Sequence, residues 1–211
     1  MVPEYWSEAK DYLINSDALL GNIIKKYSHA KLISHKNPFV TLVKSIVGQQ
    51  ISVKVADKLY QRLEISCQKN INPENIYSCD NKSLREIGLS RQKINYLKNI
   101  AIFFINDPQR LENNYFLNSD VGVLYNELIK IKGIGPWTID MFLIFHCQKP
   151  DIFPSKDIGL INSIKNTYGI KNLSKTDLDY KIVELSQNWK PWRTVATFYL
   201  WCYIDDNVVQ Y

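Results

Sequence analysis

Two glycines one residue apart give the clearest chemical signal in this sequence. They lie in the segment IKGIGPWT (131–138), between two apolar stretches. Gly133 and Gly135 permit a tight turn, and Pro136 suits the first turn of a following helix. Backbone N–H groups at such a turn can bind one phosphate without reading base sequence, and Lys132 adds a cation. A glycine-rich connection between two core helices would give the same local pattern.

The second feature is an acid at the end of a proline-rich loop. The loop KPDIFPSKD (149–157) ends in Asp157, directly before a short apolar pattern of helical spacing. A carboxylate in the first turn of a helix lies in positive potential, which favours its ionised form. Asp157 is therefore a candidate for stabilising positive charge in a transition state. A simple helix-capping aspartate is the alternative interpretation, and Ser155 is a second candidate cap for this helix.

Most of the chain shows apolar residues at three- and four-residue spacing, which is typical of helices. We find no alternating pattern of a β-hairpin, no internal repeat and no low-complexity segment. The sequence therefore predicts an all-α fold of roughly eight to eleven short helices. The apolar stripes are Phe39, Leu42, Val43, Ile46 and Val47; Ile94, Leu97, Ala101 and Phe104; Ile158, Ile161 and Ile164; and Val195, Phe198, Tyr199 and Cys202.

Composition limits the class of protein. A net charge of +5 over 211 residues favours a polyanionic partner only weakly. The four cysteines form no C-x-x-C pair, so we expect neither a zinc site nor an iron–sulfur cluster, and we expect reduced thiols. The sequence shows no secretory signal and no run long enough to span a membrane. We expect a soluble, intracellular protein with no membrane partner.

Five blocks in order resemble the helix–hairpin–helix DNA glycosylase superfamily, in its alkylbase branch of the AlkA or 3-methyladenine glycosylase II type. The hairpin is IKGIGPWT, and the acidic loop DIFPSKDIGL lies at the expected distance downstream. The other blocks are IVGQQISVKVADKL (46–59), GLSRQKINYLKNIA (88–101) and WKPWR (189–193) followed by Trp201. The resemblance runs from about 38 to 203. It implies a two-lobed helical bundle whose lobes cover about 38–120, and 1–37 plus 121–211.

The resemblance implies an enzyme that rotates a damaged base out of duplex DNA into a pocket. A side chain from the GQQ block then fills the gap, and the matching residues here are Gln50 and its neighbour Gln49. The hairpin residues Lys132, Gly133, Gly135 and Thr138 would bind a phosphate. Trp137 and Trp201 would form aromatic walls of the pocket, since aromatic faces attract electron-poor bases. Met141 lies at a pocket position where the family has tyrosine, so the substrate range does not transfer directly.

Asp157 is the acid at the family's catalytic position. Beside the sugar it would stabilise the positive charge that develops as the base leaves, and would orient or deprotonate the attacking water. Lys156 stands where relatives often place a second acid, and it would act on the pKa of Asp157 or on the DNA backbone. The histidines, His29, His35 and His146, match no block, so no residue is identified that would protonate a neutral leaving base.

Members of the superfamily that also cut the strand carry a lysine directly before the threonine of the hairpin motif. Here that position is Trp137, which has no nucleophile. The resemblance therefore implies a monofunctional enzyme without lyase activity that needs no cofactor and has no iron–sulfur cluster. Hairpins of this family commonly hold Na⁺ or K⁺ through backbone carbonyls, which would here be those of Ile129, Ile131 and Ile134.

The expected partner is double-stranded DNA containing damaged bases, bound by a monomer in the cytoplasm or at the nucleoid, or in a eukaryotic nucleus. Three alternatives stay open. One is a glycosylase for another lesion, such as hypoxanthine, uracil or an oxidised purine. Another is a non-catalytic helix–hairpin–helix DNA-binding protein, which would need the hairpin but no acid at 157. The last is an all-α protein-interaction domain, which predicts no salt-sensitive affinity for DNA.

Overall fold

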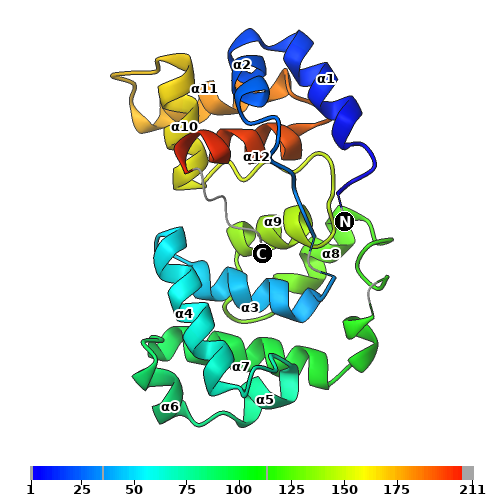
Figure 1. The fold of residues 1–211 in the computed structure, drawn as a ribbon, viewed down its shortest axis with the longest axis vertical. Coiled ribbons are helices and arrows are strands. Elements are labelled where there is room, and N and C mark those ends of the chain that lie inside the picture. Colours follow the sequence, from blue (N-terminus) through cyan, green and yellow to red (C-terminus); the bar gives the residue numbers. More distant parts are fainter. Residues whose placement is uncertain (1, 35, 113, 206–211) are drawn as a thin grey trace. The chain divides into compact units, whose positions relative to one another are not determined.

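The computed structural model describes residues 2–34, 36–112 and 114–205, which leaves His35 outside the described residues. Within these ranges the chain forms helices and no strand, which confirms the all-α prediction (Figure 1). Twelve α-helices and one 3-10 helix occur in the described chain, slightly more than expected, because the segments around residues 73–86 form two very short helices. In chain order the helices are α1 (Trp6–Ser16), α2 (Ala18–Lys26), α3 (Pro38–Gly48), α4 (Val53–Ser66), α5 (Pro73–Ser78), α6 (Asn81–Glu86), α7 (Arg91–Ile105), η1 (Pro108–Leu111), α8 (Val121–Leu128), α9 (Pro136–Phe145), α10 (Ile158–Tyr168), α11 (Lys175–Gln187) and α12 (Arg193–Ile204).

The chain divides into two units, at boundaries that differ from the predicted lobes. Among the described residues, unit 1 holds 2–33 and 148–205, and unit 2 holds the rest, from 34 to 147. The hairpin and both of its helices therefore belong to unit 2, whereas we had expected residues 121–147 to join the C-terminal part. The reason is that α9 is apolar on nearly all sides and packs on α3 as well as on α8.

Unit 2 is built around α3, whose predicted stripe is fully buried. Asn37 caps α3 by accepting a hydrogen bond from the backbone N–H of Val40, and Pro38 fits its first turn. Helices α4, α7 and α9 pack against α3. A chain of edge-to-face ring contacts ties these elements together, running from Phe39 through Phe104 and Phe116 to Phe142. This core fixes the two features of unit 2 that matter for function, the C-terminal end of α3 and the hairpin before α9.

Unit 1 packs α1, α2, α10 and α12 against one another. The stripe predicted for α12 is buried as expected. The stripe predicted for α10 is only partly correct, because Ile164 is fully buried as expected whereas Ile158 is 74% exposed. The buried residues of α10 are Leu160, Ser163 and Ile164, so the core face is rotated away from Ile158.

Asp17 connects three segments of unit 1 through one carboxylate. Its Oδ1 accepts hydrogen bonds from the backbone N–H groups of Leu19 and Leu20, and so caps α2. Its Oδ2 accepts from the Tyr168 hydroxyl at the end of α10, at 2.6 Å, and from the Trp189 indole N–H, at 3.0 Å. Burial, followed by this hydrogen bond and the adjacent carboxylate, raises the pKa of Tyr168, so the hydroxyl stays a donor. One aspartate thus fixes α2, α10 and the segment that precedes α12.

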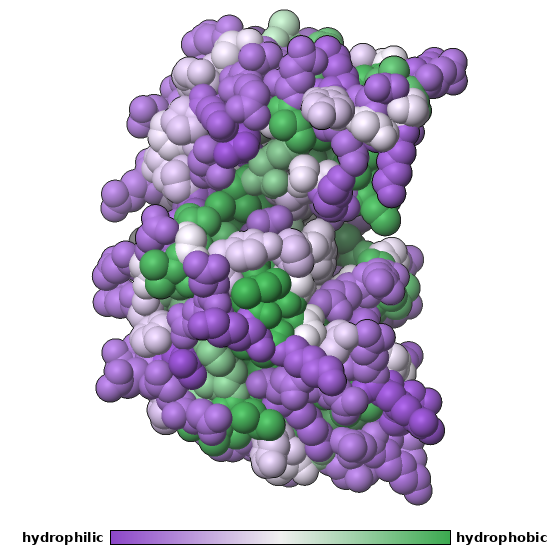
Figure 2. Space-filling model, turned by 180° about the vertical axis from the view of Figure 1, so that it is seen from behind, coloured by the Kyte–Doolittle hydropathy of each residue, from purple (hydrophilic) through white to green (hydrophobic). Residues whose placement is uncertain are grey.

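Within the described residues, no helix combines the length and apolarity that crossing a membrane requires. The face shown in Figure 2 is largely hydrophilic, with apolar side chains reaching the surface in patches between charged ones. Such exposed apolar residues are ordinary for a folded protein.

We expect Asp17→Ala to lower the free energy of unfolding by about 3 kcal/mol, because it removes a helix cap and leaves two buried donors without their acceptor. The matched control is Asp80→Ala, which removes the exposed cap of α6 and should cost much less. Urea unfolding followed by circular dichroism measures both. Equal losses would show that the contacts of Asp17 beyond its cap contribute nothing.

Candidate functional site

The hairpin between α8 and α9 requires glycine at its first position for two reasons. Gly133 has a φ of +109°, a conformation that side chains rarely adopt. A Cβ atom at Gly133 would also lie 2.1 Å from Cγ of Tyr96, which is far too close. Gly135 differs, since its φ is −108° and no atom lies within 4 Å of an added Cβ. The close approach of the Tyr96 ring to the hairpin backbone therefore explains only the first of the two glycines.

Two amide side chains hold the hairpin from outside. Asn99 of α7 donates to the backbone carbonyl of Lys132 at 2.9 Å. Gln49, at the end of α3, donates to the carbonyl of Gly133 at 3.3 Å and to Oγ1 of Thr138 at 3.0 Å. Gln49 was predicted to share the wedge with Gln50, but its amide serves to fasten the hairpin instead. Thr138, predicted to bind phosphate, is 1% exposed with its hydroxyl engaged by Gln49, so only its backbone N–H is left for that role.

Gln50 lies in the turn between α3 and α4 and is exposed. Its φ of +59° places a non-glycine residue in the left-handed region, which costs roughly 1–3 kcal/mol. Both glutamines line a groove along α4, and Gln49 also donates to the hairpin. A strained, exposed amide fixed to a rigid turn is suited to enter a gap in a ligand, as the wedge prediction requires.

Lys132 borders a surface pocket of about 560 Å³ beside the hairpin. The pocket walls are otherwise polar or basic and come from α7, with Gln92 donating a hydrogen bond to the Tyr96 hydroxyl. The remaining wall residues are Asn95, Lys98 and Asn99. Two lysines and several amide groups next to a glycine hairpin form an environment suited to a phosphate.

The carbonyls expected to hold a monovalent cation lie on the same turn. The carbonyl of Ile131 accepts the N–H of Ile134 at 3.0 Å, and a carbonyl oxygen has a second lone pair for an ion. Ile129 is the C-terminal cap of α8, where carbonyls lack helical partners. The turn thus fits the ion. Across residues 2–34, 36–112 and 114–205, no group of three or more His, Cys, Asp or Glu side chains is placed to hold a metal.

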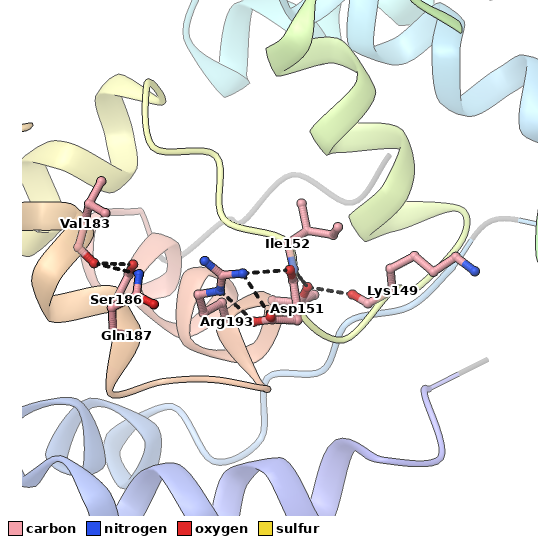
Figure 3. A network of polar contacts seen from close by, with 8 residues as sticks. Lys149, Asp151, Ile152, Val183, Ser186, Gln187 and Arg193 are labelled. Carbon is pink, nitrogen blue, oxygen red and sulfur yellow. Dashed lines mark hydrogen bonds and ion pairs between the residues drawn. The ribbon is translucent and has the colours of Figure 1, made fainter. Parts of the chain in front are cut away.

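In unit 1, the proline-rich loop 148–157 is fastened to α12 by a polar network (Figure 3). Arg193 donates to both carboxylate oxygens of Asp151, at 2.6 and 2.8 Å, in a forked ion pair. Thr194 donates to the carbonyl of Lys149 and accepts from the N–H of Ile152, and its own N–H donates to the carbonyl of Pro150. The WKPWR block therefore has a clear structural task, which is to position the loop that carries Asp157.

Asp157 ends this loop as the N-terminal cap of α10. Its Oδ1 accepts the N–H of Leu160 at 2.7 Å and the indole N–H of Trp201 at 2.9 Å. The N-terminal cap of α10 is Asp157 and not Ser155, so the expectation that Ser155 caps this helix is wrong. Gly159 permits the arrangement, because a Cβ there would lie 3.2 Å from Oδ1 and 3.7 Å from the Trp201 ring. The carboxylate is thus half-buried and held in one orientation, with the positive end of α10 beneath it.

Lys156, next to Asp157, forms a surface ion pair. Its ammonium pairs with Asp179 of α11 at 2.6 Å, and its side chain is exposed. An exposed pair of this kind contributes little stability, and the two roles proposed for Lys156 stay predictions.

The predicted pocket residues of α9 differ in exposure. Trp137 is half-buried, whereas Met141 is only 1% exposed and belongs to the core face of α9. Sequence reasoning missed Asp140, one turn after Trp137, where burial raises the carboxyl pKa to about 6. The signal was an acid within an otherwise apolar helix. His146 caps α9, and its ring stacks on Phe142 at 4.9 Å, consistent with a helix-end residue.

Comparison with known proteins decides the family. The model of the HhH-GPD superfamily of base excision DNA repair proteins matches residues 43–190. The chain belongs to this superfamily. DNA-3-methyladenine glycosylase 1 of Schizosaccharomyces pombe is 31% identical over 188 residues, covering 86% of this chain and 79% of that protein. The alkylbase DNA glycosidase-like protein mag2 of the same organism is 27% identical, and the match covers 93% of this chain and 92% of that protein.

A solved structure of S. pombe 3-methyladenine DNA glycosylase (Mag1) in complex with abasic DNA matches with a TM-score of 0.82. It is 26% identical to this HhH-GPD protein and covers 97% of this chain and 98% of that one. The hairpin and Asp157 both lie inside the matched region of the family model, so family and fold agree with the resemblance seen in sequence.

The two hairpin glycines of this HhH-GPD protein make a matched test. Gly133→Ala should lower the free energy of unfolding by about 2 kcal/mol, because it adds φ strain and displaces Tyr96. It should also weaken binding to duplex DNA. Gly135→Ala should change both quantities little, since its φ suits any residue and the space is open. Thermal unfolding and fluorescence anisotropy measure the effects, and equal loss in both variants would refute the role of the Tyr96 contact.

Proposed function

We propose that this protein is a monofunctional DNA glycosylase that hydrolyses the N-glycosidic bond of alkylated bases in duplex DNA. The observation that carries the proposal is the carboxylate of Asp157, held by Trp201 and by the N-terminus of α10 in a member of a base excision repair family. The relatives named as 3-methyladenine glycosylases support the alkylated-base substrate.

Asp157 acts on the sugar. As the bond to the base breaks, positive charge develops on the sugar ring, and a fixed carboxylate stabilises that charge without having to reorganise. Trp201 and Leu160 keep the carboxylate in place, so little entropy is lost at the moment of reaction. The same carboxylate orients or deprotonates the attacking water. An alkylated base that is already cationic leaves readily, so it needs no strong acid.

Unit 2 supplies DNA binding. The hairpin with Lys132, Gly133 and Gly135 binds backbone phosphate through N–H groups and charge, while Gln50 fills the space left by the rotated nucleotide. Its amide offers hydrogen bonds to the base that has lost its partner. We assign the aromatic faces for the extruded base to Trp137 and Trp201, with Met141 behind, on the strength of the motif match.

Water is the nucleophile. Trp137 stands at the position where a lysine would form a Schiff base, so the product is an abasic site in an intact strand. The reaction needs no cofactor and no iron–sulfur cluster, and the carbonyls of Ile129, Ile131 and Ile134 hold Na⁺ or K⁺ as a structural ion. We further propose that the protein acts as a monomer inside the cell, where its DNA substrate is.

A second candidate substrate, a neutral lesion such as hypoxanthine, is favoured by Asp140. Asp140 lies one turn after Trp137 on α9, and burial raises its pKa to about 6, so we assign to it the proton that a poor leaving group would need. Duplexes bearing 3-methyladenine, 7-methylguanine, ethenoadenine, hypoxanthine or uracil, assayed for base release, separate the two candidates.

We expect Asp157→Asn to slow release of methylated purines at least about 100-fold. Asparagine keeps an oxygen for the Leu160 and Trp201 donors, so the fold and binding to abasic-site DNA should persist. Single-turnover base release and anisotropy with abasic duplex check both parts. Asp179→Asn, which only breaks the exposed Lys156 ion pair, is the control and should retain wild-type rates. Undiminished release by Asp157→Asn would exclude the assigned chemistry.

The wedge can be separated from stability. Gln50→Gly should raise the free energy of unfolding by about 1 kcal/mol, because glycine relieves the strain of a positive φ, yet it removes the side chain that fills the gap. Turnover of a lesion paired with its normal partner should fall several-fold more than turnover of a mispaired lesion, since unpairing costs more in the first case. Gln50→Ala keeps the strain and should show the same turnover pattern without stabilisation. An equal fall for both lesions would contradict the wedge.

A further inference from the structure

A basic groove of about 460 Å³ extends from Gln50 along α4. One wall is α4, and the other is the turn that leads into α7. The cations that line the groove come from two helices, and no acidic residue lies among the lining residues, which are Gln49, Gln50, Ile51, Val55, Lys58, Leu59, Arg62, Gly88, Ser90 and Lys93. The function proposed above does not yet use this groove.

Charge on α4 is segregated by face. Lys54, Lys58 and Arg62 follow one another at four-residue intervals, so they form one row on the helix. The acids of α4, Asp57 and Glu64, act on the ammonium of Lys44 instead. Burial lowers the pKa of Lys44, and the two carboxylates raise it by a smaller amount. Among the described residues, the ion pairs of the protein do not include Lys54, Lys58 or Arg62.

Two of the groove cations are fixed in place by backbone carbonyls. Lys93 of α7 donates to the carbonyl of Val47 at 2.7 Å, and Arg62 donates to that of Ile87 at 3.4 Å. Gly88 lies beside Leu59 and the Arg62 guanidinium, and its φ of +105° favours glycine at this point of the groove. Next to Gln50, the side chains of Ile51 and Val55 are 37% and 50% exposed and give the groove an apolar start.

We propose that this groove binds the sugar–phosphate backbone of the DNA strand opposite the lesion, through Lys58, Arg62 and Lys93. The inference rests on the proposed function, in which the hairpin binds backbone phosphate and Gln50 enters the gap, and it assigns that phosphate to the strand that carries the lesion. Gln49 and Gln50 both line the groove, and the Gln49 amide also donates to the hairpin, so the groove and the hairpin meet at this turn. A duplex presents a backbone on each side of the gap, so the groove beyond Gln50 meets the second one.

The consequence is a preference for duplex over single-stranded DNA that does not depend on base sequence. Phosphate contacts by lysine and arginine release counterions, and each contact adds about 0.9 to the slope of log affinity against log salt. Ile51 and Val55 would lie against the apolar faces of the sugars, whereas the cations meet the phosphates.

The test is the Lys58→Gln/Arg62→Gln double variant, bound to an abasic-site duplex and to the same damaged strand alone. In the duplex, the salt slope should fall by about 2 relative to wild type. Binding to the single strand should stay unchanged. Lys82→Gln/Arg85→Gln removes one lysine and one arginine from α6 of the same unit and controls for net charge. It should leave the duplex slope as in wild type.

Methylphosphonate substitution then assigns the strand. Single uncharged phosphates on the intact strand should weaken wild-type binding but add no further loss to the Lys58/Arg62 variant. The proposal is overturned if this non-additivity occurs with phosphates of the damaged strand instead. It is also overturned if the Lys58/Arg62 variant loses as much affinity for the single strand as for the duplex, or if the α6 control lowers the duplex salt slope as much as that variant does. Release of methylated purines by the wild-type protein is measured separately, so a failure of the proposed glycosylase activity is distinguishable from a failure of the groove.

Discussion

The side-chain amide of Gln49 fixes the relation between the two elements of unit 2 to which we assign DNA binding. By donating to Gly133 and Thr138, it joins the end of α3 to the start of α9. The adjacent Gln50 has a left-handed conformation, and its side chain is exposed. Tyr96 and Asn99 hold the other side of the same hairpin. Without these contacts Gln50 and the hairpin would move independently. Binding DNA would then have to order them, and the lost conformational entropy would weaken the affinity.

In unit 1 one carboxylate has to satisfy two demands. As a cap, Asp157 stabilises α10 by accepting a backbone N–H, and the same hydrogen bond, with that of Trp201, restricts its orientation. The capping and the catalytic interpretation of this aspartate are therefore compatible rather than exclusive. Preorganisation of this kind is what makes a fixed charge effective against a transient one, because solvent would otherwise have to reorient during the reaction. The Arg193–Asp151 pair and Thr194 extend the same constraint to the whole loop.

The sequence allowed the all-α class, the hairpin and three of four apolar stripes to be predicted, since periodicity and glycine spacing are local properties. The prediction was only partly correct for α10, where Ile158 fits the spacing but faces solvent, because spacing defines a face without saying which face meets the core. Gln49 and Tyr96 could not be placed either. Their partners are 84 and 37 residues away in sequence, and such contacts depend on how helices pack. The same limit explains why the hairpin joined unit 2, since α9 is apolar on both of its packed sides.

Binding and selectivity then rest on different physics in this protein. The phosphate contacts that we assign to the hairpin and to the α4 cations depend on charge and shape, so they would act equally on damaged and undamaged DNA. Selectivity must come from the later steps, which are the unpairing of a weakly held base and the departure of a good leaving group. A carboxylate lowers the barrier for every extruded nucleotide, but the remaining barrier is small only where the base is already electron-poor. Binding that ignores base identity is thus compatible with a specific enzyme, because the discrimination is made at the glycosidic bond.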